Sequence, residues 1–121
     1  MNKWVEAAEE ALATVKNKTN IPYNWERFSE QIDQLPDTYV VYFLVSAPTM
    51  LSADNREHAY RPRIQVSLYY RKKQSFLTVP DQIIKAFTDR GFRRAGEGRI
   101  PYQSDTGHYG WRCDFNYYET R

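Results

Sequence analysis

Two aromatic-rich segments with a helical segment between them constrain the fold of this chain most. Residues 63–71 (RIQVSLYYR) and 109–118 (YGWRCDFNYY) alternate apolar and polar side chains. A period of two places the apolar side chains on one face of a strand and the polar ones on the other. Residues 79–90 repeat apolar side chains at helical spacing. The sequence therefore predicts a sheet with one apolar face that a helix covers.

The rest of the chain predicts an α+β domain. Residues 2–16 fit a helix with Asn2 as its N-cap and an apolar face of Trp4, Ala8, Ala11, Leu12 and Val15. Residues 39–45 are apolar on both faces, which is typical of a central strand. Residues 92–95 fit a further short strand. The order α-β-β-α-β-β predicts one domain, residues 1–121, with a two-layer sandwich, a mostly antiparallel sheet and helices on one face.

The boundaries of these elements are predicted from local signals. Thr78 is expected to cap the second helix, with Pro80 in its first turn and Gly91 at its end. Residues 96–107, with Gly96 and Gly98, are expected to form a loop, as is the long connection 46–61. Residues 26–35 fit either a short helix or an irregular turn.

Charge and cysteine content narrow the classes of function. The net charge is +2, with acidic and basic residues interspersed, whereas a dedicated nucleic-acid binder usually carries a strongly basic stripe. Cys113 is the single cysteine, so no intrachain disulfide forms; it lies in phase with Trp111 and Phe115 and is expected to be buried. No apolar run has the length of a membrane span, and the N-terminus does not resemble a secretory signal. We therefore expect the protein to be located in a reducing cytoplasm and not in a membrane.

The residue types that carry catalysis do not gather in this sequence. His58 and His108 each fall in a predicted loop, without the ligand spacing of a metal site. Cys113 faces the predicted core and cannot readily meet His108 as a nucleophile would meet its base. The Gly96–Gly98 segment lacks the lysine and the following helix of a phosphate-binding loop. The sequence predicts no enzyme, no cofactor and no metal.

Apolar and aromatic residues in otherwise polar segments predict a binding surface. Met50 and Leu51 lie in the first long loop, and Ile100 and Tyr102 lie in the second. Tyr and Arg are enriched at protein interfaces. The candidate interface residues are Met50, Leu51, Arg56, His58, Tyr69, Arg71, Ile100 and Tyr102. The alternative is a small nucleic-acid-binding or adaptor domain that uses the aromatic and basic sheet face of Tyr69 and Arg71, which we weigh several-fold lower than a protein interface.

The order of segments resembles a known family. A helix leads through Ile21-Pro22-Tyr23 to the strand 39–42, a long excursion precedes the strand 64–69, and a helix ending at Gly91-Phe92 precedes the polar loop 105–108 and a last strand. In this order and spacing the chain resembles the tail terminator (tail completion, head–tail joining) proteins of long-tailed bacteriophages and prophages. The likeness covers most of the chain and rests on patterns rather than on catalytic residues.

The resemblance implies a structural function. It implies a small α+β domain that assembles into a hexameric ring, caps the tail tube, ends tube polymerisation and joins tail to head. The implied partners are other copies of the chain, the tail tube protein and a head-completion or connector protein, with DNA only passing through the channel. The implied location is the virion tail, and the host bacterial cytoplasm during assembly.

Overall fold

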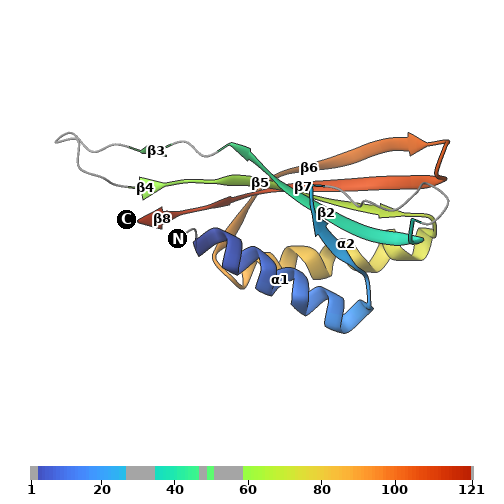
Figure 1. The fold of residues 1–121 in the computed structure, drawn as a ribbon, viewed down its shortest axis with the longest axis horizontal. Helices are drawn as coiled ribbons and strands as arrows, with labels where there is room; N and C mark the ends of the chain where they lie inside the picture. The colour runs from blue at the N-terminus through green and yellow to red at the C-terminus, as the bar shows by residue number, and fades with distance from the viewer. Residues whose placement is uncertain (1–2, 27–34, 47–48, 51–58, 121) are drawn as a thin grey trace.

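The chain forms a five-stranded sheet with two helices on one of its faces (Figure 1). The computed structural model describes residues 3–26, 35–46, 49–50 and 59–120. The strands lie in the order β1-β2-β5-β7-β6; their bounds are β1 Tyr23–Trp25, β2 Thr38–Ser46, β5 Arg63–Tyr70, β6 Phe92–Gln103 and β7 His108–Tyr117, and the helices are α1 Lys3–Thr19 and α2 Lys73–Thr88. β1 pairs with β2 in parallel, and the other pairs are antiparallel. The predicted α+β class is confirmed, with β1 as an additional edge strand.

The core lies between the helices and the sheet. The predicted apolar face of α1 is buried in full, and Cys113 is buried with Trp111 and Phe115 as the alternation of β7 predicts. Phe87 of α2 stacks on Phe115 with ring centroids 4.7 Å apart. These contacts fix the helical layer on the apolar face, and no helix of the described residues lies on the opposite face of the sheet (Figure 1).

Helix α2 begins at Lys73, six residues before the predicted start. Phe76 stacks on Tyr70 at 5.6 Å, and Thr78 donates its hydroxyl to the carbonyl of Gln74, so the first turns are already helical. Pro80 therefore lies inside the helix, not in its first turn, and Thr78 is not the cap. A proline does not stop this helix because the packing of the preceding turn outweighs the lost hydrogen bond.

Strand β6 is twelve residues long, and the predicted loop after Ala95 is wrong. Gly96 and Gly98 lie within the strand and pair with β7. The register shifts between Arg94 and Gly96, and Gly96 has a φ of +152°, as a glycine-containing bulge allows. The glycines therefore bend a continuous strand, and the connection to β7 shrinks to residues 104–107.

The long connection 46–61, predicted as a loop, contains two short strands. β3 (Thr49–Met50) pairs with β4 (Ala59–Tyr60), and β4 pairs with β8 (Glu119–Thr120). This three-stranded sheet lies beyond the first turn of α1, at the end of the molecule that holds both termini (Figure 1). We call it the arm. The open alternative for residues 26–35 falls almost entirely on residues 27–34, outside the described residues.

Candidate functional site

The described residues show no arrangement for metal or nucleophilic chemistry. Among them, no three His, Cys, Asp or Glu side chains gather as a metal site. Burial raises the pKa of the Cys113 thiol to about 12, so it is not a thiolate at neutral pH. His108 was predicted in a loop, but it is the first residue of β7, fully buried, with Nε2 2.8 Å from the Pro36 carbonyl oxygen. None of the described helices is long and apolar enough to cross a membrane.

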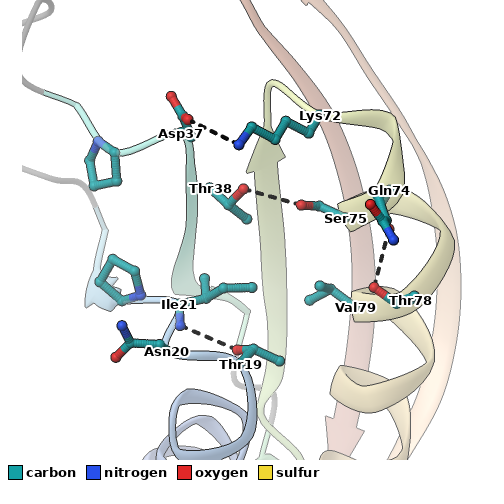
Figure 2. Close-up of a pocket in the computed structure, with 12 residues that line it drawn as sticks. Thr19, Asn20, Ile21, Asp37, Thr38, Lys72, Gln74, Ser75, Thr78 and Val79 are labelled. Carbon is teal, nitrogen blue, oxygen red and sulfur yellow. Dashed lines mark hydrogen bonds and ion pairs between the residues drawn. The ribbon is translucent and has the colours of Figure 1, made fainter.

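A hollow of about 560 Å³ lies where the end of α1 faces the starts of β2 and α2 (Figure 2). Its hydroxyl groups are engaged within the protein: Thr38 lies 3.3 Å from Ser75, and Thr78 donates to the Gln74 carbonyl at 3.1 Å. Lys72 and Asp37 at its rim are 4.0 Å apart. Its lining therefore offers no converging acid, base or nucleophile.

Two predicted interface residues, Tyr69 of β5 and Arg71 directly after β5, contribute mainly to the domain itself. Tyr69 stacks on Tyr39 with ring centroids 5.1 Å apart. Arg71 donates to the carbonyl of Thr106 at 3.0 Å and to the carboxylate of Asp37 at 2.8 Å. The hydrogen bond from Arg71 lowers the pKa of the Asp37 carboxyl. Arg71 thus ties the β6–β7 turn to the start of β2, and the aromatic and basic face proposed for nucleic acid has little free donor capacity here.

An aromatic surface forms where α2 begins and the β6–β7 hairpin ends. Tyr102 is 54% exposed and Tyr109 43% exposed, with ring centroids 4.7 Å apart. Leu77 of α2 is 62% exposed. Beside them lies a groove of about 440 Å³ lined by Tyr70, Arg71, Lys73, Phe76, Leu77, Arg99 and Tyr109. We call this the aromatic groove.

Arg99 helps to shape the aromatic groove. Its guanidinium lies 4.9 Å from the centroid of the Phe76 ring and 3.5 Å from the hydroxyl of Tyr70. Tyr70 is itself sandwiched between Phe76 and Tyr109. The groove thus combines ordered aromatic walls with the cations of Arg99 and Lys73, a combination typical of interfaces.

Of the residues at this surface, the sequence predicted Tyr102 but not Leu77, Arg99 or Tyr109. Leu77 was placed outside the second helix, whereas it lies on the exposed side of the first turns of α2. Tyr109 was read as part of a strand with one buried face, but the helical layer does not cover that end of β7. The apolar residues Phe76 and Leu77, directly before the predicted cap Thr78, were the sequence signal that could have indicated an apolar surface here. Ile100, which was predicted as an interface residue together with Tyr102, is half-buried against Gly110.

The arm is the second candidate surface. Met50 is the last residue of β3, while Leu51, Arg56 and His58 lie outside the described residues. Three further exposed residues at the base of the arm were not predicted as interface residues: Leu44, Val45 and Tyr118. Val45 is 47% exposed. The sequence predicts all three in strands of the sheet, and the structure shows their side chains exposed. The arm and the aromatic groove lie at opposite ends of the sheet (Figure 1).

Comparison with known proteins finds a likeness among solved structures. No family model matches the chain, and no curated protein matches it. A solved structure, the sheath/tube terminator of an extracellular contractile injection system (PVC) in its extended state, superposes with a TM-score of 0.46 at 9% sequence identity. The match covers 97% of this chain and 58% of that chain. At these values the likeness does not establish a shared function.

Proposed function

We propose that this chain is a structural tail-terminating protein of a phage or phage-like tail. In this role, copies of the chain form a ring on the end of the tail tube, end tube polymerisation and join the tail to the head. The proposal starts from the family resemblance in segment order, which implies a small α+β domain. One observation carries it further: two candidate surfaces, the arm and the aromatic groove, lie at opposite ends of the five-stranded sheet (Figure 1).

Two separate surfaces at opposite ends of the sheet suit a ring. A contact between two different patches repeats from copy to copy, and it closes into a ring when the rotation per copy is a fraction of a full turn. A symmetric pair would instead need one self-complementary patch. Exposed apolar side chains at both ends, such as Val45 and Leu77, are a liability in an isolated domain but are covered in such an assembly.

The remaining parts of the proposal follow from this role. The ring is hexameric, its partners are the tail tube protein and a head-completion or connector protein, and DNA only passes through the channel. The protein is not an enzyme and needs no cofactor. It is located in the virion tail, and in the host bacterial cytoplasm during assembly.

A tube-capping experiment tests this function. Tail tube protein encoded beside this chain is polymerised with and without the purified chain, and tube lengths and ends are measured by electron microscopy. We expect shorter tubes with an added ring of density at one end, because a bound ring blocks the next layer of tube protein. Tubes of unchanged length with bare ends, at concentrations of the chain far above those of tube ends, would overturn the proposal. A polymerisation reaction with a different domain of similar size is the control.

A further inference from the structure

A small polar hollow lies at the base of the arm, apart from the aromatic groove. It has a volume of about 180 Å³ and is lined by Ser46, Arg61, Arg63 and Asn116. The sheet register places Ser46 opposite Arg63, and Arg63 opposite Asn116. Ile64 and Phe115, the neighbours of Arg63 and Asn116 in their strands, point into the core. Arg63 and Asn116 therefore lie side by side on the sheet face that carries no helix.

The hollow collects hydrogen-bond donors that the described residues use only in part. Arg63 binds the carboxylate of Asp114 through Nε at 3.0 Å and Nη2 at 2.9 Å, which leaves its Nη1. Arg61 makes no ion pair with any described carboxylate; its guanidinium is held 6.0 Å from the centroid of the Tyr118 ring. The hydroxyl of Ser46 and the amide of Asn116 add further donors. A small acceptor with several oxygens would satisfy these groups together.

The charge around the hollow favours an anion. Arg93 approaches the same Tyr118 ring as Arg61, with its guanidinium 5.9 Å from the centroid. Nη1 of Arg112 lies 3.4 Å from Oδ1 of Asp114, so this carboxylate is shared between Arg63 and Arg112. One carboxylate cannot neutralise the positive charge of all the arginines around the hollow. Within the described part of the chain, the cations here outnumber the carboxylates. Like charges gathered in this way repel each other unless an anion binds between them.

We propose that this hollow is a binding site for a phosphate group. The planar donor fork of arginine matches phosphate oxygens, and serine and asparagine side chains can complete the contacts. The phosphate is either a free inorganic ion or a group of a nucleic-acid backbone, since both present the same oxygens. The inference does not depend on tail termination.

Titration with sodium phosphate tests the site. The ¹⁵N-labelled protein is titrated with sodium phosphate, and sodium chloride keeps the ionic strength constant. The side-chain N–H signals of arginine and asparagine are followed by NMR. We expect saturable shifts that include Arg61, Arg63 and Asn116. Arg61→Gln should weaken binding about tenfold, because it removes a charge-assisted donor pair. Arg61→Lys keeps the positive charge but loses the planar pair of donors. Its affinity for phosphate should therefore lie between those of the parent protein and Arg61→Gln.

Arg99→Gln is the matched control, because Arg99 is an exposed arginine that contacts the aromatic groove and not this hollow. It should bind phosphate as the parent protein does. Circular dichroism establishes that each variant is folded. Absence of saturable shifts, or equal binding by folded Arg61→Gln, would overturn the proposal.

A single-stranded oligonucleotide of ten nucleotides distinguishes the two sources. If the site serves a nucleic-acid backbone, the oligonucleotide binds more tightly than inorganic phosphate, phosphate competes with it, and Arg61→Gln weakens it. If only inorganic phosphate binds at this site, the ligand is the free ion. Oligonucleotide binding that Arg61→Gln and Arg99→Gln weaken equally would show general charge attraction and overturn the nucleic-acid source.

Discussion

Ile100 of β6 lies directly against the backbone of Gly110 in β7. A Cβ atom built on Gly110 would lie 2.5 Å from the Cβ atom of Ile100, closer than any normal contact. Ile100 is half-buried on the sheet face that carries no helix. The glycine therefore allows an aliphatic side chain to lie flat across its neighbouring strand.

Replacement of this glycine should destabilise the protein. We expect Gly110→Ala to lower the free energy of unfolding by about 1–3 kcal/mol, as overpacking does, measured by urea denaturation. Gly98→Ala is the matched control, because its nearest contact is the flexible end of Arg112 at 3.3 Å. Ile100→Gly in the Gly110→Ala background removes the Cβ atom that would clash, so the double variant should lose less stability than the sum of the two single losses. Equal effects of the two glycine variants would contradict this account.

Cys113 should be inert in the folded protein. Burial raises its pKa to about 12, so the thiolate that reacts with alkylating reagents is nearly absent at pH 8. We expect iodoacetamide to modify Cys113 at least ~100-fold more slowly in the native protein than in guanidinium chloride, measured by mass spectrometry. Similar rates in both conditions would show that β7 is not packed as described.

The same group makes stability depend on pH. A thiol has a pKa of about 8.5 in an unfolded chain, and in the fold that value is raised. Its contribution is therefore complete below about pH 8.5 and is lost as the pH rises toward the folded value of about 12. Cys113→Ala should flatten the alkaline part of the stability curve, although it also leaves a small cavity.

At the scale of elements, helix α2 shows how local signals misplace a boundary. Thr78, Pro80 and Asp81 together form a common helix start, and they predict a cap at Thr78. The structure instead begins the helix at Lys73, because Phe76 packs on Tyr70 of the preceding strand. That contact depends on where β5 ends in space, which no local signal contains.

A better N-cap at the observed start of α2 should stabilise the protein. Lys72 occupies the N-cap position with extended backbone angles and makes no side-chain hydrogen bond to the helix. We expect Lys72→Ser to raise the free energy of unfolding by about 1 kcal/mol, because the hydroxyl can accept from a free amide of the first turn. Thermal denaturation measures the gain. Lys73→Ser, one residue inside the helix, is the control and should give none; a gain from both would argue against Lys72 as the cap.

At the scale of the whole molecule, the arm and the aromatic groove should be tested together. Val45 and Leu77 are exposed, so a single charge at either position should disturb an interface without disturbing the core. We expect Val45→Glu, Leu77→Glu and the double variant Met50→Glu/Leu51→Glu each to reduce tube capping about tenfold or more, as loss of an apolar interface contact does.

The same tube-capping assay provides a control variant and the result that would contradict the prediction. Asn17→Glu, at an exposed position of α1 away from both surfaces, should cap tubes normally. All variants should keep the circular dichroism spectrum of the parent protein. Normal capping by Val45→Glu and Leu77→Glu would remove the arm base and the aromatic groove from the assembly model, while leaving the test with the parent protein unaffected.

The sequence by itself determined the α+β class, the apolar face of α1 and the burial of Cys113. Each follows from a period of side chains along a single element, and such a period survives in any arrangement that covers the apolar face. The alternation in residues 63–71 and 109–118 thus predicted two strands with one apolar face each, and the structure pairs them with each other from Arg63 and Asn116 to Tyr70 and Tyr109.

Only the tertiary structure decided the length of β6, the start of α2 and the strands of the arm. Gly96 and Gly98 are turn signals in the sequence, but pairing with β7 keeps them in a strand. Likewise, the hollow at the base of the arm joins Ser46, Arg61 and Asn116 from three distant segments. Contacts between segments far apart in the chain set these features, so no local pattern could predict them.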